Sequence, residues 1–369
     1  MFKTNLKPRR NVVGCKKAMR SAALAFFFLS IIPTQGQTNV VSGTAYGTND
    51  LSEATSITSI EDGEGTLLIG FSGTTNINVE HDITGFIVVT NRAADFSIEA
   101  INASVTSSGG TALAVINATN NLSLTGGRYV GTTDTGGGAS PSAALGGLLR
   151  NSKATIEGSE FTGAAGYAGM TVQSSELEVT DGTFRGGVNA VGLLAVSNST
   201  VTIDSGSFTG RIGMAVLTSD LTINDGIFSG GDNGAGLYAI SNSVVTITNG
   251  IFTGGINSAA LYVSDGILTN KGGSFIGGDN AEGLYAENSD VTIEGGTFTG
   301  GTNAAALYDS NVTIEDGTFT GGANAAAVYA RNSDLIINGG IFQGGSFETN
   351  SYFGLVSIAD ATQTNNITL

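Results

Sequence analysis

The stretch NSDVTIEGGTFTGGTNAAALY, from Asn288 to Tyr308, decides the fold of this chain. It contains three short runs, VTIE, TFT and AAALY, which are separated by GG, by GGTN and by a polar turn. In VTIE apolar residues alternate with polar ones, as expected for a strand with one buried face. The runs are too short for helices, and their Gly, Asn and Thr content disfavours helix. The stretch therefore predicts three short strands joined by turns.

The same unit recurs along the chain from about Glu160 onward. Its phenylalanine is found at Phe161, Phe184, Phe208, Phe228, Phe252, Phe275, Phe298, Phe319 and Phe342, and subtracting each position from the next gives intervals of 20 to 24 residues. A repeat of this length that holds three strands predicts one coil of a parallel β-helix. Crossovers between parallel strands are right-handed by default. The predicted fold is all-β, a right-handed, three-sided, single-stranded parallel β-helix with about 23 residues per coil.

A single coil cannot bury its own inner face, so like residues of successive coils should stack in columns. The phenylalanines form one predicted inward column, and a second is predicted at Met170, Leu193, Val216, Leu237, Leu261, Leu284, Leu307 and Val328. A ladder of asparagines that follow the GG pair is predicted at Asn189, Asn233, Asn257, Asn280, Asn303 and Asn324. A second ladder is predicted at Asn198, Asn242, Asn288, Asn311 and Asn332. Asparagine tolerates left-handed turns and can bond its copy one coil away, and the paired glycines should supply positive φ.

The first 36 residues differ in kind from the rest. Seven basic residues precede an apolar run from Ala22 to Ile32, and Thr34-Gln35-Gly36 is suitable as a cleavage site. This pattern predicts a secretory signal peptide that directs the chain to the outside or the surface of the cell. The apolar run is too short to span a bilayer. The start is either Met1 or Met19, and the only cysteine, Cys15, would leave with the leader.

Removal of the leader changes the charge of the chain. Seven of 15 basic residues would be lost and none of the 31 acidic residues, which leaves 8 minus 31, or −23. Such a surface disfavours binding to nucleic acid and to anionic membranes. The sequence therefore predicts a soluble, self-repelling, exported protein.

The remaining chain divides into an irregular part and a regular part. We assign residues 37–110 to an N-terminal cap with irregular leading coils and residues 111–369 to regular coils, with a loop around Pro141. The last residues, TNNITL, resemble the first strand of another coil, with Asn366 in the ladder position. Open strand edges are normally covered. We therefore expect that the chain is a fragment, or that end-to-end self-association or another protein caps it.

These repeats resemble those of bacterial secreted β-helix proteins, and they are most similar to the passenger regions of autotransporter-type adhesins with VTIxGGTFTGG units. The resemblance covers roughly Asn121 to the end of the chain. It implies the fold, but it says little about activity, because adhesins, stalks and carbohydrate-active enzymes share such repeats. No membrane barrel follows the repeats in this sequence.

Catalytic and metal-binding residues are not expected. The sole histidine, His81, lies in the irregular part and has no repeat partner. Glu157, Asp181, Asp204, Glu294 and Glu315 are predicted to share one coil position, which indicates a solvated face and not the closely spaced pair of a glycosidase. Such a column could hold calcium only weakly. We predict no cofactor, no resident metal and no enzymatic activity.

One predicted outward column could bind a partner. Tyr238, Tyr262, Tyr285, Tyr308 and Tyr329, which we name the tyrosine stripe, follow Leu194 and Leu217 in that column. Stacked aromatic residues on a long face suit contact with sugar rings, whereas stacking on one another for stability is the simpler interpretation. The sequence favours a non-enzymatic adhesive or structural module that binds a polysaccharide or a cell-surface partner. The alternative is a polysaccharide-binding or polysaccharide-degrading β-helix.

Overall fold

The computed structural model describes residues 56–57, 63–70, 75–79, 82–90, 95–107, 109–133, 144–323, 325–345, 356–358 and 367–368. Several predicted features lie outside these residues. They are the signal peptide with Cys15, and His81, Pro141, Asn324 and Asn366.

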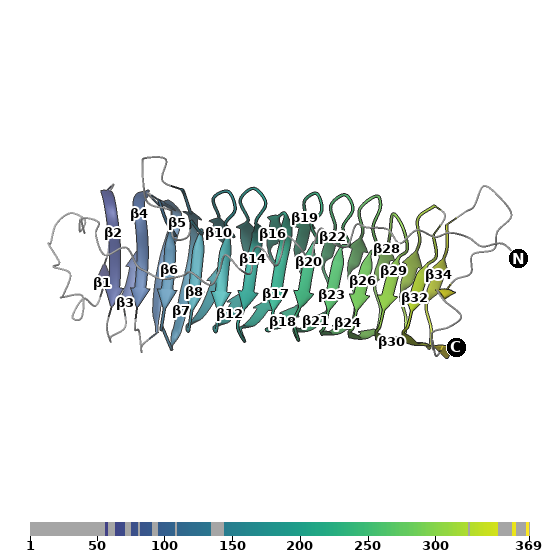
Figure 1. Cartoon of the computed structure of the whole chain (residues 1–369). Helices are drawn as coiled ribbons and strands as arrows, with labels where there is room; N and C mark the ends of the chain where they lie inside the picture. The colour runs from purple at the N-terminus through teal and green to yellow at the C-terminus, as the bar shows by residue number, and fades with distance from the viewer. Residues whose placement is uncertain are drawn as a thin grey trace, which may run out of the picture.

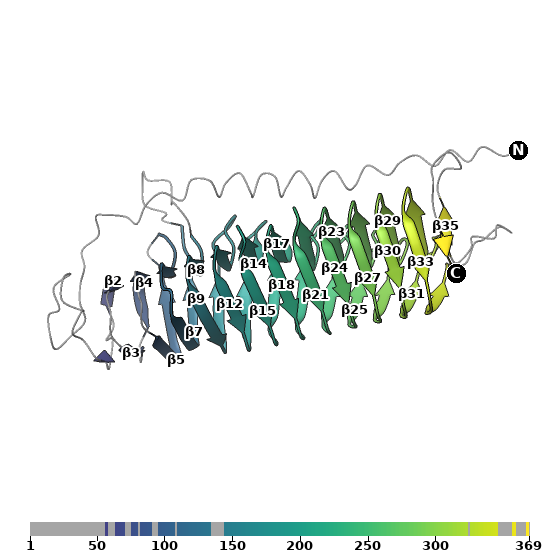
Figure 2. The same cartoon turned by 90° about the horizontal axis from the view of Figure 1, so that it is seen from below.

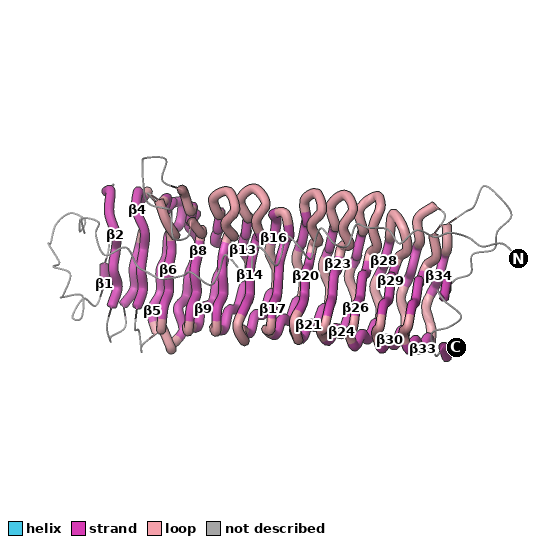
Figure 3. The backbone as a smooth tube through the Cα atoms, viewed as in Figure 1, coloured by secondary structure: helices cyan, strands magenta, loops and turns pink. Residues whose placement is uncertain are grey.

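The described chain is a β-solenoid without helix, so the predicted all-β parallel β-helix is confirmed. Its 36 strands pair in parallel with the equivalent strands of the preceding and following coils. Figure 1 shows the coils stacked in a single row from β2 to β34, and Figure 2 shows the strands of one side lying next to one another. The loops lie in a row along one edge of the solenoid (Figure 3). Most coils contribute one strand to each of three rows of parallel strands, which we name face 1, face 2 and face 3.

Face 1 begins with β1 (Ser56–Ile57), β3 (Thr75–Asn78) and the first halves of β5 (Phe96–Thr106) and β7 (Asn121–Val130). It continues with β9 (Lys153–Glu157), β12 (Glu176–Val179), β15 (Thr200–Ile203), β18 (Asp220–Ile223), β21 (Val244–Ile247), β24 (Ile267–Asn270), β27 (Asp290–Ile293), β30 (Asn311–Ile314), β33 (Asp334–Ile337) and β36 (Ile367–Thr368). Face 2 takes the second halves of β5 and β7, then β10 (Ser159–Thr162), β13 (Gly182–Arg185), β16 (Ser207–Gly210), β19 (Ile227–Gly230), β22 (Ile251–Thr253), β25 (Ser274–Ile276), β28 (Thr297–Thr299), β31 (Thr318–Thr320) and β34 (Ile341–Gln343).

Face 3 contains most of β2 (Gly63–Gly70) and β4 (Ile83–Thr90), which bend across the corner from face 2. It continues with β6 (Leu113–Ile116), β8 (Gly147–Arg150), β11 (Met170–Gln173), β14 (Val191–Val196), β17 (Ile212–Leu217), β20 (Leu237–Ile240), β23 (Leu261–Ser264), β26 (Leu284–Glu287), β29 (Ala305–Tyr308), β32 (Val328–Arg331) and β35 (Val356–Ile358).

A ladder of aromatic rings on face 2 forms the centre of the core. Tyr129 and the nine phenylalanines from Phe161 to Phe342 stack one on the next, with ring centroids 4.6 to 5.4 Å apart and nearly parallel planes. Every ring from Tyr129 to Phe319 is fully buried, and Phe342 is partly buried. The spacing is that of hydrogen-bonded strands, so backbone pairing holds each ring against the next.

Tyr129 is the one polar member of this ladder, and its hydroxyl finds no hydrogen-bond partner among the described residues. Burial also raises the pKa of this hydroxyl above its usual range. Because a buried donor without a partner costs about 1–3 kcal/mol, Tyr129→Phe is expected to raise the free energy of unfolding by about 1 kcal/mol, measured by urea denaturation. Tyr329→Phe, at a half-buried tyrosine of face 3, is the control and should change stability by less than about 0.5 kcal/mol. A loss of stability in the first variant would contradict the assignment.

The second inward column differs from the predicted one at two coils. Leu193 pairs with Met214 and not with Val216, and Leu284 pairs with Ala305 and not with Leu307. The column is therefore Met170, Leu193, Met214, Leu237, Leu261, Leu284, Ala305 and Val328. The predicted residues still point inward, because positions two apart on a strand share a face.

Shortened loops explain this shift. The first inward residue of face 3 usually follows the phenylalanine by nine positions, as from Phe228 to Leu237. It follows by six positions from Phe208 to Met214 and by seven from Phe298 to Ala305. The loop between faces 2 and 3 is shorter in these two coils, so counting forward from the phenylalanine gives the wrong register: nine positions after Phe298 is Leu307, whereas the column holds Ala305.

The glycine pairs have two different roles, and the prediction of positive φ is right for one of them. At the corner between faces 1 and 2 the glycine before the strand has positive φ, with values of 105° at Gly296 and 133° at Gly317. In the loop between faces 2 and 3 the paired glycines have no positive φ. There the second glycine allows close approach instead, since a Cβ on Gly278 would lie 2.0 Å from the carbonyl oxygen of Gly255.

The two asparagine ladders are mixed with other residues. In the first, Asn280 Nδ2 donates to Asn257 Oδ1 at 3.0 Å. In the second, the left-handed corner residues include Asp265 and Asp309, which accept from Asn288 and Asn332 in the next coil. Asn311 does not belong to this corner, because it pairs with Asp290 and Asp334 as a strand residue of face 1. Asp309 takes the corner position in its coil.

A ladder of buried serines, which the sequence analysis treated only as polar turn, follows this corner. Its members are Ser152, Ser175, Ser199, Ser219, Ser243, Ser289, Ser310 and Ser333, all less than a tenth exposed. Ser199 shows the pattern: its hydroxyl donates to the Val196 carbonyl at 2.7 Å and accepts the Ser175 N–H at 3.3 Å. The Ser199 N–H donates to the Ser219 hydroxyl at 3.1 Å. The ladder thus satisfies backbone groups that the corner takes out of strand pairing.

Ser199→Ala is expected to lower the free energy of unfolding by about 1–3 kcal/mol, because the buried N–H of Ser175 and the Val196 carbonyl lose a partner. Thr200→Ala is the matched control, since Thr200 is its exposed neighbour on face 1, and it should cost less than about 0.5 kcal/mol. Urea denaturation followed by circular dichroism compares the two. Equal effects would mean that the serine hydroxyls do not stabilise the corner.

Candidate functional site

The tyrosine stripe lies on the outer surface of face 3, but its register differs from the predicted one. Tyr238, Tyr262 and Tyr285 pair in successive coils, and the next position is Ala306, followed by Tyr329. Tyr308 lies two residues further along β29, in register with Glu287 and Arg331. The same shift occurs in the other coil with a short loop, where Ala215 holds the column position and Leu217 lies two residues on.

The stripe has an ordered part and a tilted part. Tyr238, Tyr262 and Tyr285 stack with centroids 4.6 and 5.0 Å apart and planes 6° and 4° apart. Tyr308 is tilted by 32° against Tyr285 at 5.2 Å, and Tyr329 by 52° against Tyr308 at 5.7 Å. Tyr238, Tyr262 and Tyr285 are 2%, 5% and 7% exposed, whereas the other two are half-buried. Neighbouring rings cover both faces of Tyr262, and the tilted part is the more exposed part of the stripe.

Charged groups surround the tilted part. Burial raises the pKa of Tyr308 above its usual range, and the nearby carboxylates Glu282 and Glu287 act in the same direction, against Arg331. Glu282 accepts from the hydroxyl of Thr302 at 2.9 Å, and Glu287 accepts from Tyr262 Oη at 3.3 Å. Glu287 and Arg331 are the residues paired with Tyr308 on the two neighbouring strands, so a hydrogen-bond acceptor and a cationic donor flank this tyrosine.

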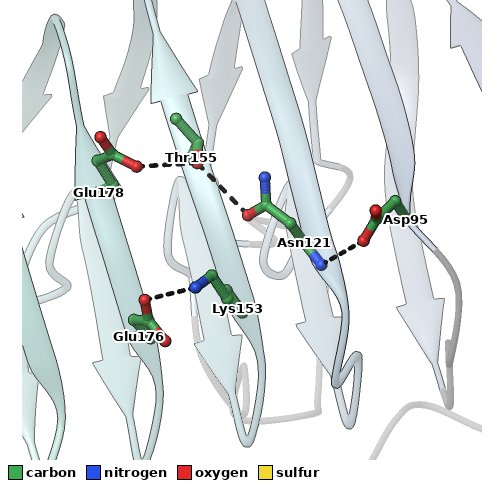
Figure 4. Close-up of polar contacts among 6 residues, drawn as sticks. All are labelled: Asp95, Asn121, Lys153, Thr155, Glu176 and Glu178. Atoms are coloured by element: carbon green, nitrogen blue, oxygen red, sulfur yellow. Dashed lines mark hydrogen bonds and ion pairs between the residues drawn. The ribbon is translucent and has the colours of Figure 1, made fainter.

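A second polar area lies on the outer surface of face 1 at the N-terminal end. There Lys153 Nζ donates to Glu176 Oε1 at 2.6 Å, and Thr155 lies between Asn121 Oδ1 and Glu178 Oε2 at 3.4 Å from each (Figure 4). Both side chains of the ion pair are about half exposed, with fractions of 45% and 57%. Such exposed pairs contribute little to stability.

The carboxylates Glu176 and Glu178 were missed as a pair by the sequence analysis. They point outward from β12, where the neighbouring strand β15 has Thr200 and Thr202. Glu178 departs from the repeat, because its position carries Thr202 and Thr222 in the next two coils, whereas the position of Glu176 carries a carboxylate again at Asp220. The signal was available in the run ELEV, whose third residue is glutamate where the face 1 strands of several other coils have threonine, as in TVTI at Thr200–Ile203 and DVTI at Asp290–Ile293.

The predicted acidic column is not uniform. Glu157, Asp204, Glu294 and Glu315 share a position, but Asp181 lies one residue further along its coil, where Thr180 takes that position. Amides of the next coil bind two of these carboxylates: Asn224 Nδ2 donates to Asp204 at 2.7 Å, and Asn338 Nδ2 donates to Glu315 at 3.0 Å. Within the described part of the chain, no group of three or more His, Cys, Asp or Glu side chains is placed to hold a metal ion.

The comparison with known protein families supports the fold. The model of the right handed beta helix region matches residues 145–276, which lie within the regular coils. Together with the parallel pairing of equivalent strands in successive coils, this match identifies the molecule as a right-handed parallel β-helix repeat protein. No curated protein and no solved structure matches the chain. None of the described segments forms a helix with the length and hydrophobicity needed to cross a bilayer.

Proposed function

We propose that this protein is exported and acts outside the cell or at its surface as a non-enzymatic adhesive or structural module, as the passenger regions of autotransporter-type adhesins do. The observation that carries the proposal is the ladder of ten stacked rings, which runs without a break through the coils from β7 to β34 and joins them into one rod. A rod with three long outer faces can hold a binding surface away from the point at which it is anchored. The leader pattern of residues 1–36 and the net charge of −23 that remains without it support export.

The test uses the chain from residue 37 onward, coupled to latex beads. We expect these beads to adhere to surfaces coated with polysaccharide or with whole cells, and uncoated beads to remain free. Mass spectrometry of the protein exported from a bacterial host should show that it begins after Gly36. Retention of the leader, or beads that adhere no better than uncoated ones, would contradict the proposal.

A polysaccharide-degrading β-helix is the second candidate, and the outward pair Glu176 and Glu178 favours it. A glycosidase needs two carboxyl groups near the scissile bond. Release of reducing ends from pectin, alginate and neutral glucans distinguishes the two functions. We expect no release, and release that is abolished by Glu178→Gln would establish the enzyme instead.

A further inference from the structure

Within the tyrosine stripe, the regular outer surface of face 3 is interrupted at one coil, and the interruption creates a distinct local surface. In β29 the column position that Tyr285 and Tyr329 occupy in the neighbouring coils is taken by Ala306, whose side chain is fully buried. The displaced ring of Tyr308 lies two residues along the strand and fills part of the space. Departures from a regular pattern are expected at functional positions.

The interruption changes what the aromatic rings can contact. Tyr262 lies between Tyr238 and Tyr285, so neighbouring rings occupy both of its faces. The tilts of 32° and 52° on the two sides of Tyr308 turn its face and that of Tyr329 out of the stack. The face of an aromatic ring carries partial negative charge and packs against C–H groups of partial positive charge. The C–H face of a pyranose ring is such a surface.

The polar groups around these two rings fit the hydroxyl groups of a sugar. Glu287 and Arg331 pair with Tyr308 from the two neighbouring strands, and Glu282 lies against Thr302 in the loop before β29. The two carboxylates can accept hydrogen bonds and the Arg331 guanidinium can donate them. A few polar groups around an aromatic surface are typical of small-ligand sites, where they fix the orientation of the ligand. Two carboxylates beside one guanidinium disfavour an anionic sugar, because like charges that face each other are costly.

We propose that Tyr308 and Tyr329, together with Glu282, Glu287 and Arg331, bind a pyranose unit of a neutral polysaccharide. The proposal names a ligand class for the adhesive function and rests on that function only for its biological setting. It restricts the contact to the tilted end of the tyrosine stripe and gives the stacked tyrosines a structural role.

The test compares three variants of the chain from residue 37 onward. Tyr308→Ala removes the tilted ring, and the double variant Ala306→Tyr/Tyr308→Ala returns a ring to the column position that Tyr285 and Tyr329 share. Tyr238→Ala is the matched control, since it removes a ring of the ordered part and keeps the hydrogen bond from Tyr262 to Glu287. Circular dichroism and thermal midpoints verify that each variant is folded. If Tyr308→Ala does not fold, the double variant, which keeps the aromatic ring on face 3, tests the proposal alone.

Binding is measured by calorimetry with cellohexaose, laminarihexaose and mannohexaose as neutral probes and polygalacturonate as the acidic probe. The chain has no tryptophan, so tyrosine emission gives a second readout. We expect at least one neutral probe to bind, and its affinity to fall at least about tenfold in Tyr308→Ala and in the double variant but less than about twofold in Tyr238→Ala.

Each other outcome overturns the proposal: no neutral probe binds, polygalacturonate binds as tightly as the neutral probes, the double variant binds as tightly as the unchanged chain, or Tyr238→Ala weakens binding as much as Tyr308→Ala does. The bead assay separates this result from the broader function. Beads that adhere although no neutral probe binds would refute the sugar site and leave the adhesive function intact. Probe binding without bead adhesion would support the site and refute the adhesive function.

Discussion

Phe298→Ala is expected to lower the free energy of unfolding by about 3–5 kcal/mol, which is the cost of deleting a buried aromatic side chain. Phe298 is fully buried and stacks on Phe275 at 4.6 Å and on Phe319 at 4.9 Å, so its loss removes two ring contacts. The cavity cannot close easily, because backbone hydrogen bonds hold the coils on both sides in register. Urea denaturation followed by far-UV circular dichroism measures the effect.

The control for this variant is Thr299→Ala, one residue along the same strand. Thr299 points outward from β28 and is half-buried. Its replacement should cost less than about 0.5 kcal/mol. If the two variants lost the same stability, the inward position of the phenylalanine ladder would not be what holds the coils together.

The period of the repeat and the inward positions of the phenylalanines could be predicted from the sequence, because both depend on local chemistry that every coil repeats. Alternation within a strand of four residues determines which side chains share a face. The rings of Phe184, Phe252 and Phe298 stack where this alternation places them. Stacking of like residues then follows from the constant rise between paired strands.

The register on face 3 could not be predicted in the same way. Val216 and Leu307 were assigned to a column two residues from the one that Met214 and Ala305 occupy. Alternation cannot distinguish these positions, because residues two apart point to the same side. The choice depends on where the shortened loop ends and the strand begins, and this is a property of pairing between coils.

The geometry of the tyrosine stripe depends on that register. Sequence alone placed Tyr308 in line with Tyr285 and Tyr329, which would have made five equivalent rings. Because Ala306 holds the position between them, Tyr308 approaches from the neighbouring column and tilts. The candidate site thus arises from a difference between coils, whereas repeat analysis finds what the coils share.

The serine ladder had a signal in the sequence that was not used. In most of the regular coils a serine lies just before the face 1 strand, as in the runs NSTVTI and NSDVTI. Serine is common in turns, so its presence there did not indicate burial. The structural reason is the Ser175 N–H of the preceding coil, which donates to the Ser199 hydroxyl and becomes visible only when the coils are stacked.

Gly278→Ala is expected to lower the free energy of unfolding by about 3 kcal/mol or more, at the upper end of the cost of overpacking. A Cβ at this position would lie 2.0 Å from the carbonyl oxygen of Gly255 in the preceding coil. Because both partners are backbone atoms, the clash is relieved only by moving one coil against the other, and this strains strand pairing on both sides of the loop. Equivalent glycines have the same close contact, with distances of 1.9 Å at Gly255 and 2.1 Å at Gly322.

The chain offers a matched control in the same position of another coil. Gly231 also follows its phenylalanine by three residues, but the loop of the preceding coil is shortened there. As a result, a Cβ on Gly231 would lie 3.3 Å from the nearest atom, the carbonyl oxygen of Gly210, and neither glycine has a positive φ. Gly231→Ala should therefore cost less than about 1 kcal/mol. Urea denaturation of the two variants shows whether these glycines are needed because the coils approach closely there or because glycine is intrinsically flexible. Flexibility would make the two costs equal, whereas close approach makes Gly278→Ala the far more damaging change.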